Sequence, residues 1–340
     1  MRYLLEALDA VPFRFEHDRK LRSAVGLLRA ALARRPRLIV MEGTGLAGGL
    51  ALLAIDAVLG VPFVVSGGDA VAPYLRLRSR VVGPFAAAYE RLLCKRCAGY
   101  IGWTPYLAGR ALTFGAPRAM TAPGWARSEA GAGAGETVRS RLGIAPDAVV
   151  VGLAGMLHWR ARVGYAYGAE LVRSVRAVER DDIVALIVGD GSGRARLQEL
   201  AGEDLGRRVL LPGRVAPEQV PDYLAAFDLA SLPQSVDGVG SFRYTTKLSE
   251  YLAAGLPIIT GQIPAAYDLD RGFLWRLPGP APWSTTYVEA LTALLESLTR
   301  AEIARKSPDG GHRLHDVFDR AAQQRRVSAF IGELLTQLDE

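Results

Sequence analysis

Short, largely apolar runs recur along the whole chain and alternate with stretches in which the apolar residues follow helical spacing. Several of these runs are apolar at every position, which is typical of strands that are covered on both faces of a parallel sheet. Regular alternation of such strands with helices predicts a doubly wound α/β architecture. The predicted strands are residues 37–42, 62–66, 99–103, 148–155, 183–189, 208–213, 228–233 and 257–260.

A stretch rich in glycine and other small residues, residues 129–148, interrupts this alternation. Such a composition is typical of a connection between domains, so we predict two α/β domains. The expected divisions are a first domain over residues 1–125, a connector over 126–147, a second domain over 148–315 and a C-terminal helix within 316–340 that can pack on either domain.

Residues 46–68 are apolar and long enough to cross a bilayer. However, Asp56 lies near the middle of the stretch, and the sequence from Gly60 to Pro62 breaks it. A buried helix followed by a buried strand therefore fits better than a membrane span. The first ten residues carry acids and lack a small-residue cleavage site, which predicts no signal peptide and a cytoplasmic protein.

The two cysteines, Cys94 and Cys97, form a CKRC motif on a predicted helix. A zinc site would need a second pair of ligands, and no histidine lies nearby in the sequence. A thioredoxin-like site would place the motif directly after a strand. We expect both residues to be reduced thiols on a helix face, with no metal bound to them.

Positive charge is concentrated in the first domain. Residues 1–125 carry a net charge of +9, and the remainder of the chain carries −3. The excess has two explanations: solvated helix faces in an arginine-rich chain, or a face for anionic lipid or an anionic acceptor. Lysine is rare, with four residues against 37 arginines, so a lysine beside a polar motif is informative, because an ammonium differs from a guanidinium.

Four predicted strands of the second domain end in loops that are rich in glycine and polar residues. Open α/β sheets bind ligands outside the carboxyl ends of their strands, so we expect these loops to line one crevice. Tight turns, helix N-termini and basic side chains together suit a nucleoside diphosphate. The candidate residues in these loops are Gly155, Arg160, Arg162, Gly189, Gly191, Gly213, Arg214, Val215, Asp237 and Ser241.

The stretch TTKLSEYLAAGLPIITG, residues 245–261, predicts a helix and a following strand. Glu250 lies four residues after Thr246 and therefore does not complete a capping box, which needs a spacing of three. Two interpretations of Glu250 stay open. It is either a solvated acid favoured by the helix dipole or an acceptor of hydrogen bonds from sugar hydroxyls. In the second case Thr245, Thr246 and Lys247 would hold a phosphate at the helix N-terminus.

The segment GDGSGRARL partly matches a dinucleotide-binding fingerprint, with Gly189 and Gly191 as its first two glycines. The third position is Arg194, which is too bulky for the close approach of helix and strand. The acid that would bind the ribose of NAD is also missing, whereas an arginine there could suit NADP. An NADP-dependent oxidoreductase is therefore the less favoured alternative.

Four motifs occur in order and at ordinary spacing over residues 148–262. They are a glycine-ended strand before two arginines, LIVGDGSGRARLQELA, RVLLPGRVAPEQVPDYLAAFDLASLPQS and KLSEYLAAGLPIITG. In this combination the segment resembles the donor-binding domain of glycosyltransferase family 4, the glycogen synthase and mannosyltransferase type. Weaker similarity extends over most of the first domain. The resemblance implies a GT-B fold, in which two Rossmann-like domains face a central cleft, and a retaining transferase that uses a nucleotide-sugar donor without a cofactor or an obligatory metal.

The resemblance also implies a role for each matching residue. Glu250 matches the second acid of the family's paired-glutamate motif and would hold the ribose hydroxyls of the donor. Arg160 or Arg162, together with Lys247, would neutralise the diphosphate, where negative charge develops as it leaves. The remaining donor contacts would come from the backbone of Gly213, Arg214 and Val215 and from the amides of Ser241, Thr245 and Thr246.

The sequence departs from the family pattern at three places. Phe242 occupies the position of the first glutamate, and Asp237, in a DGVG that resembles the family's EGFG, is its candidate replacement. The His-Asp pair expected after strand 62–66 is reduced to Gly68-Asp69, which leaves Asp69 as the nearest catalytic candidate. Residues 1–15 read as the family's first helix and second strand. Two explanations of the missing first strand stay open: the start codon is misassigned, or the first domain is reduced and its acceptor site uses Glu42, Gly43, Thr44, Gly68 and Asp69.

The basic first domain suits a glycan or lipid-linked acceptor at the inner face of a membrane, with peripheral association with anionic lipid and no nucleic-acid partner. Two alternatives stay open. A catalytically silent GT-B subunit that assists a partner enzyme would explain the missing acid, the missing histidine and the reduced first domain. A sugar-nucleotide epimerase would need an acid–base pair, and the predicted crevice holds none.

Overall fold

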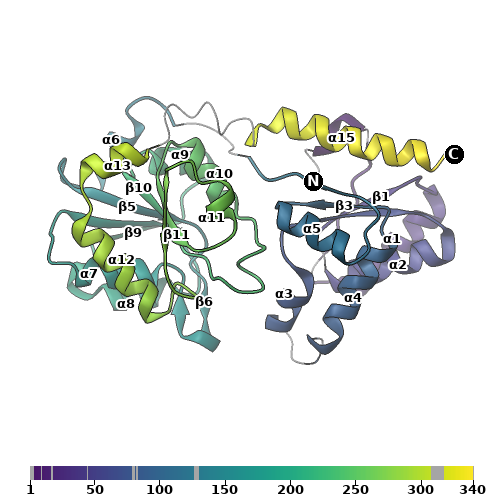
Figure 1. Ribbon diagram of the computed structural model, residues 1–340, viewed down its shortest axis with the longest axis horizontal. Helices are drawn as coiled ribbons and strands as arrows, with labels where there is room; N and C mark the ends of the chain where they lie inside the picture. The colour runs from purple at the N-terminus through teal and green to yellow at the C-terminus, as the bar shows by residue number, and fades with distance from the viewer. Residues whose placement is uncertain are drawn as a thin grey trace. The chain divides into compact units, whose positions relative to one another are not determined.

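The computed structural model describes residues 4–8, 10–16, 18–43, 45–78, 81, 83–125, 130–307 and 318–339. The contacts within the chain divide it into two compact units (Figure 1). Unit 1 comprises Met1–Gly124, Phe242–Thr245 and Asp316–Glu340, and unit 2 comprises Trp125–Ser241 and Thr246–His315. Each unit is built on one parallel sheet, which confirms the predicted pair of α/β domains.

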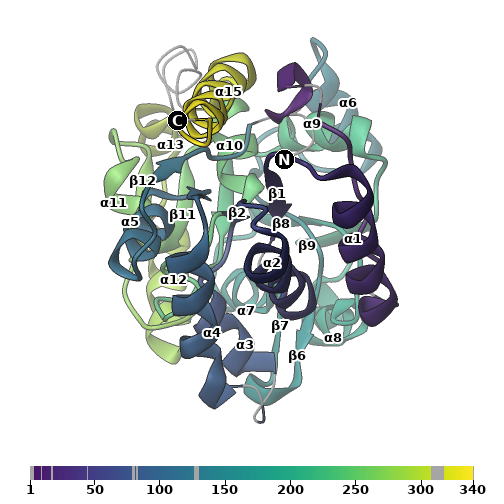
Figure 2. The ribbon, with the colours of Figure 1, turned by 90° about the vertical axis from the view of Figure 1, so that its right-hand side faces the viewer.

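Unit 1, whose strands β1 and β2 are labelled in Figure 2, has a four-stranded parallel sheet whose strands lie in chain order. The strands are β1 (Ile39–Glu42), β2 (Phe63–Gly67), β3 (Gly99–Gly102) and β4 (Ala119–Thr121). The helices are α1 (Lys20–Arg34), α2 (Leu46–Leu59), α3 (Val71–Arg78), α4 (Gly83–Arg96), α5 (Pro105–Thr113) and α15 (Arg320–Gln337). The central strand β2 is buried at all of its positions, because helices cover both faces of the sheet.

The apolar stretch 46–68 forms helix α2 and then strand β2, as predicted. Gly60 ends α2 in the left-handed conformation, with a φ of 66° that an L side chain rarely adopts. Among the described residues, no helix is both long enough and apolar enough to span a bilayer.

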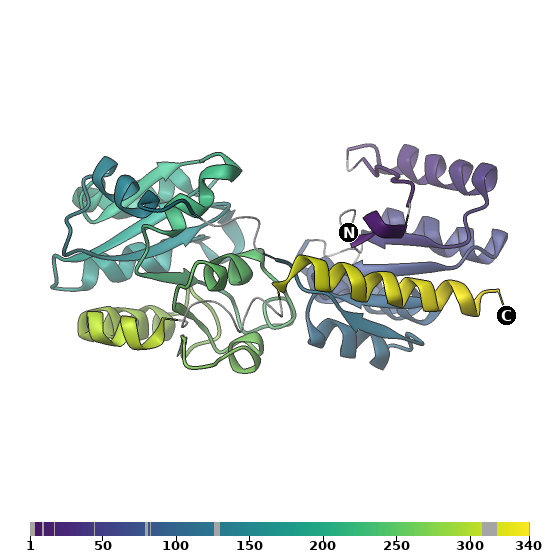
Figure 3. The same ribbon diagram turned by 90° about the horizontal axis from the view of Figure 1, so that it is seen from above.

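The C-terminal helix α15 packs on unit 1. A side chain at Gly99 on β3 would collide with Phe330 of this helix, because an added Cβ would lie 2.8 Å from the Phe330 Cζ atom. Two exposed ion pairs add to this contact: Arg118 with Glu333 of the helix, and Arg37 with Asp339 just after it. The last helix of the chain is therefore part of the first α/β unit (Figure 3).

One prediction for unit 1 is wrong. The sequence predicts a helix and then a strand over residues 1–15, but the described part of this segment contains only a short 3-10 helix, Glu6–Leu8, and no strand. The phenylalanines that suggest a strand contact helices instead. The Phe13 ring lies against Gly26 of α1, and the Phe15 ring lies beside Gly48 of α2. Packing on helix surfaces thus replaces pairing with a sheet edge.

The CKRC motif lies at the end of α4, with both cysteines buried and free. Burial raises the pKa of the Cys94 and Cys97 thiols to about 12, so both are protonated near neutral pH. Because the thiolate is the reactive form, these cysteines are residues of the core.

Unit 2 has a six-stranded parallel sheet with the order β12-β11-β10-β5-β8-β9. The strands are β5 (Val149–Ala154), β8 (Ile183–Val188), β9 (Val209–Gly213), β10 (Leu229–Leu232), β11 (Ile258–Gly261) and β12 (Leu274–Leu277). The chain builds outward from β5 to β9, then returns to β10 on the other side of β5. The strand order therefore reverses between β5 and β10, and open sheets of this kind bind ligands at the carboxyl ends of such strands.

Helices and one small hairpin complete unit 2. The helices are α6 (Ala134–Arg141), α7 (Ala169–Ala177), α8 (Arg194–Ala201), α9 (Val220–Leu224), α10 (Thr246–Ala253), α11 (Ala265–Asp268), α12 (Thr285–Ser297) and α13 (Arg300–Lys306). The hairpin pairs β6 (Trp159–Arg160) with β7 (Tyr165–Ala166). The segment 126–147, which we predict to connect the domains, contains α6 and belongs to unit 2.

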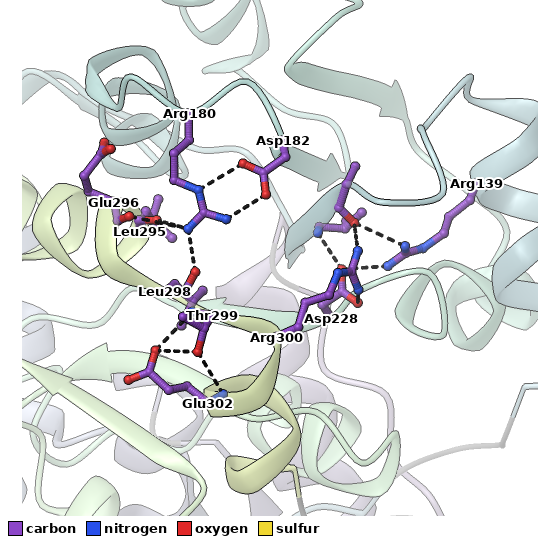
Figure 4. A network of polar contacts seen from close by, with 12 residues as sticks. Arg139, Arg180, Asp182, Asp228, Leu295, Glu296, Leu298, Thr299, Arg300 and Glu302 are labelled. Carbon is purple, nitrogen blue, oxygen red and sulfur yellow. Dashed lines mark hydrogen bonds and ion pairs between the residues drawn. The ribbon is translucent and has the colours of Figure 1, made fainter.

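An ionic network holds the amino-terminal edge of the unit 2 sheet (Figure 4). Asp228, just before β10, accepts hydrogen bonds from the Val150 amide at 2.6 Å and from the Arg139 guanidinium at 2.8 Å. Arg300 lies on the other side of the same carboxylate, at 3.8 Å. These contacts join α6, α13 and two adjacent strands. The polar side chains that could bind a ligand lie at the opposite, carboxyl edge.

Candidate functional site

Backbone hydrogen bonds join the chain at the carboxyl ends of three strands of unit 2, and each of these ends has a glycine. The Gly155 amide donates to the Val188 carbonyl at 2.8 Å, and the Gly189 amide donates to the Gly213 carbonyl at 2.9 Å. Gly189 has a φ of 147°, and an added Cβ would lie 1.8 Å from the carbonyl oxygen of Gly155. No side chain fits there, so bare backbone forms the floor of this edge. The predicted residues Gly155, Gly189 and Gly213 are thus brought together.

Lys247 lies directly on this floor. It is the second residue of α10, and an added Cβ at Gly155 would lie 2.3 Å from its Cε atom and 2.8 Å from its Nζ atom. The ammonium also lies 5.6 Å from the centroid of the Tyr167 ring, which favours a cation. Because Gly155 follows β5, this cation lies at the point where the strand order reverses.

A buried hydrogen bond joins helix α10 to strand β5. The Tyr251 hydroxyl accepts a hydrogen bond at 2.9 Å from the amide of Ala154, the last residue of β5. Both the tyrosine and the strand are fully buried. Glu250 is half-buried one residue earlier, and Thr246 begins the helix. The structure therefore gathers Thr246, Lys247 and Glu250 on a helix that Tyr251 joins to β5.

The two predicted arginines lie on the β6–β7 hairpin, and both are exposed. The Arg160 guanidinium lies 5.7 Å from the ring centroid of Trp283, while Arg162 lies in the 3-10 turn at the hairpin tip. The hairpin follows β5 and so extends from the same edge as Lys247. Its arginines have long side chains that can reach an anion there.

Asp237 organises the loop that follows β10. Its Oδ1 atom accepts hydrogen bonds of 2.8 Å from the amides of Val239 and Gly240. Burial raises the pKa of Asp237, but these amide bonds, with a smaller contribution from the charge of Arg160, outweigh burial and hold the pKa below its ordinary value. The Ser241 amide donates to the Asp237 carbonyl at 3.0 Å. An ionised carboxylate thus shapes the loop that carries Ser241.

The remaining donor candidates lie in the neighbouring loops. Gly191 follows β8, and its amide donates to the Asp190 side chain at 2.8 Å. Arg214 is exposed and Val215 half-buried after β9. Arg194, whose bulk argues against a dinucleotide fingerprint, donates to the Leu211 carbonyl at 2.9 Å and lies beside Gly213. Its contact with β9 gave no signal in the sequence.

The predicted acceptor residues lie at the carboxyl edge of the unit 1 sheet. Glu42 pairs in register with Ser66, whose carbonyl accepts from the Gly43 amide at 2.7 Å. Gly68 and Asp69 follow β2 directly, so the two loops are neighbours. Thr44 lies outside the described residues.

The Asp69 carboxylate forms an ion pair that the sequence did not suggest. Its Oδ1 atom lies 2.5 Å from Nε of Arg243. Arg243 belongs to the Phe242–Thr245 segment, and this segment makes its contacts within unit 1. Of the predicted donor residues, Thr245 is therefore grouped with unit 1, whereas Ser241 and Thr246 belong to unit 2.

Metal ligands are not gathered anywhere in the described part of the chain. Within it, no three His, Cys, Asp or Glu side chains come close enough to hold a metal ion. The carboxyl edge of the unit 2 sheet offers cations, backbone amides and one carboxylate close to the backbone of Gly155, Gly189 and Gly213, and these groups can stabilise charge.

Comparison with known proteins gives a consistent result. Residues 148–296 match the family model of the glycosyl transferases group 1. No curated protein sequence matches the chain. Among solved structures, sucrose-phosphate synthase from Thermosynechococcus elongatus is similar with a TM-score of 0.72 and 15% identity, over 97% of this chain and 82% of that one.

Two further structures show the same fold. HepE from Anabaena in complex with UDP-glucose has a TM-score of 0.67 and 16% identity, over 98% of this chain and 88% of that one. The UDP-forming trehalose-phosphate synthase from Burkholderia vietnamiensis has a TM-score of 0.62 and 16% identity, over 98% of this chain and 81% of that one. The chain thus has a GT-B fold with a small N-terminal sheet, and its residues 148–296 are similar to the glycosyl transferases group 1.

Proposed function

We propose that the chain is a retaining hexosyltransferase whose unit 2 holds a nucleoside-diphosphate sugar and whose unit 1 holds the acceptor. The observation that carries this proposal is the position of Lys247, whose side chain lies against the backbone of Gly155. A cation fixed at the reversal of the strand order, beside a helix N-terminus, suits a diphosphate.

The proposed chemistry depends on the leaving group. The bond between the anomeric carbon and the diphosphate oxygen breaks, the oxygen of the acceptor hydroxyl forms the new bond on the same face of the sugar, and the proton of this hydroxyl passes to the departing diphosphate. Negative charge then develops on the departing diphosphate, where Lys247 and Arg160 or Arg162 would stabilise it. No residue of the chain is assigned as a nucleophile, so rate enhancement would come from positioning and from this electrostatic stabilisation.

The other donor contacts follow from the same arrangement. Glu250, half-buried near the start of α10, would accept hydrogen bonds from the ribose hydroxyls. The backbone of Gly213, Arg214 and Val215 would recognise the base. Uridine is the first base to test, because HepE was crystallised with UDP and with UDP-glucose.

We propose that the acceptor is a glycan or a lipid-linked molecule that unit 1 binds through Glu42, Gly43, Thr44 and Gly68, whereas Asp69 of the same loop pairs with Arg243. An anionic acceptor at the inner face of a membrane would be attracted by the net charge of +9 over residues 1–125.

Titration calorimetry of the purified chain with UDP, ADP, GDP and UDP-glucose, followed by turnover assays, tests the donor site. Charged hydrogen bonds contribute roughly 1.5–3 kcal/mol, so Glu250→Ala should weaken nucleotide binding about tenfold or more. Lys247→Ala should lower kcat by roughly 100-fold, with a smaller effect on binding, because it acts where charge develops. Lys95→Ala and Glu289→Ala, which remove exposed charges of α4 and α12 that have no proposed role in donor binding, are the matched controls and should change neither.

Unchanged nucleotide affinity in Glu250→Ala would refute the ribose contact. Donor binding without either transfer or donor hydrolysis would favour a catalytically silent subunit, and no binding of any nucleotide would refute the donor site itself.

A further inference from the structure

A four-residue segment, Phe242–Thr245, makes its contacts within unit 1, although the residues on either side of it belong to unit 2. We call this segment the strap. It follows the loop that Asp237 organises and immediately precedes α10, the helix that carries Lys247. Whatever fixes the strap therefore also fixes the residue from which α10 starts.

Hydrogen bonds hold the strap to the loops that follow β2 and β3. The Thr104 hydroxyl donates to the Phe242 carbonyl at 3.0 Å, and the Tyr244 amide donates to the Gly68 carbonyl at 3.3 Å. The Tyr244 ring is buried and meets the Trp103 ring edge to face, with centroids 6.5 Å apart. The backbone of the strap thus forms hydrogen bonds with the rest of unit 1 at two points.

Charged side chains provide the other contacts. Arg243 pairs with Asp69 at 2.5 Å, and both side chains are only about one-third exposed, at 30% and 31%. The Phe242 ring lies 5.2 Å from the guanidinium of Arg110, which is itself held by two 2.8 Å bonds to the buried Glu90. A partly buried pair is screened less by solvent than a surface pair, so it can hold a short segment.

We propose that Arg243 and Asp69 are positioning residues of the transfer reaction: their ion pair fixes the strap, and the strap fixes the first turn of α10 with Lys247. Asp69 then acts through Arg243 and not on the reacting atoms. The loop after β2, which carries predicted acceptor residues, is thereby coupled through three peptide bonds beyond Tyr244 to the lysine proposed to hold the diphosphate. The role of Arg243 and Asp69 in the transfer reaction rests on the proposed function. Their role in fixing the first turn of α10 does not.

Hydrogen exchange of the ligand-free chain tests the structural part. Arg243→Ala and Asp69→Ala should each speed exchange of the amides of residues 244–248 by about fivefold, the factor that corresponds to a pair of ~1 kcal/mol. The charge-swapped chain, Asp69→Arg with Arg243→Asp, should recover most of the protection. The control is Arg37→Ala, which removes an ion pair of unit 1 remote from the strap and should leave these amides unchanged.

Kinetics with the donor that calorimetry identifies test the functional part. Both single variants should lower kcat severalfold at nearly constant KM for the acceptor, and the swap should restore kcat, since the swapped pair again fixes the strap. If Asp69 touches the reacting atoms, the swap restores exchange protection but not kcat, and the positioning role is overturned. Unchanged exchange in both single variants overturns the strap itself, whether or not the chain binds a nucleotide.

Discussion

Lys247 shows how much information a single residue carries in a chain of this composition. It is one of four lysines in an arginine-rich sequence, and its position beside Glu250 predicts a phosphate site. Its stem fills the space where a side chain at Gly155 would lie. That contact joins residues 92 positions apart, so no local sequence pattern could reveal it.

Glu170 is a second residue with a testable consequence. It is fully buried at the start of α7, and one carboxylate oxygen accepts a 2.6 Å hydrogen bond from the Tyr165 hydroxyl. Its other oxygen has no hydrogen-bond partner among the described residues. Burial raises the pKa of Glu170 to about 7, although the bond from Tyr165 and the charge of Arg173 lower it in part. Tyr287 and Tyr167 also face this carboxyl group.

This raised pKa predicts how stability changes with pH. The folded chain holds the Glu170 proton more tightly than the unfolded chain, so this group favours folding at low pH. Its contribution should fall as the pH rises from about 4.5 to 7 and be lost above that range, by up to ~3 kcal/mol. Glu170→Gln should remove this part of the pH dependence, as measured by urea unfolding between pH 5 and pH 8. Glu289→Gln, a change to an exposed acid of α12, should leave the profile unchanged, and equal profiles for the two variants would contradict the prediction.

At the scale of elements, an ionic network lies at the amino edge of the unit 2 sheet, and the proposed donor site lies at its carboxyl edge. Asp228 joins β10, β5, α6 and α13 at the amino edge, with its side chain 18% exposed. Asp228→Ala would leave the Arg139 guanidinium, which is 11% exposed, without its carboxylate. We expect a loss of about 3 kcal/mol in the free energy of unfolding, because a buried charge is left unpaired.

The same variant should bind nucleotide with unchanged affinity, because the network lies at the edge opposite to Lys247. Asp339→Ala breaks an ion pair in which Arg37 is 58% and Asp339 63% exposed, and it should lose at most ~1 kcal/mol. Urea unfolding and calorimetry measure the two effects. A large loss of affinity in Asp228→Ala would contradict the separation of the two edges.

The sequence predicted elements well where burial gave them a clear pattern. The eight strands predicted from the largely apolar runs are all present, because burial between helices requires such runs, whereas the strand predicted within residues 1–15 is not. Strands β4 and β12 were missed: the three residues of β4 are only half-buried, and β12 contains an exposed arginine. Hairpin β6–β7 was missed because its strands have two residues each. The strap could not be predicted, because Arg243 and Asp69 are 174 residues apart.

At the scale of the whole molecule, positive charge is distributed unevenly along the chain. The excess of +9 belongs to residues 1–125, and α1 concentrates it on one exposed helix without any acid. Leu21, Val25 and Leu32 of this helix are 83%, 48% and 52% exposed. The exposed basic residues among them are Lys20, Arg22, Arg29 and Arg34. Apolar side chains among cations are typical of helices that lie on an anionic bilayer surface, so α1 is where membrane association should be tested.

Sedimentation with lipid vesicles provides this test. The chain should bind vesicles that contain phosphatidylglycerol more strongly than vesicles of phosphatidylcholine alone, and added salt should release it, because screening shortens the reach of each charge. Arg22→Glu should weaken binding about tenfold, since one cation near the surface contributes ~1 kcal/mol and its reversal adds repulsion. Arg305→Glu changes the net charge of the chain by the same amount on exposed α13 of unit 2. Equal losses in both variants would mean that only the net charge matters, and salt-insensitive or absent binding would remove the membrane from the proposal.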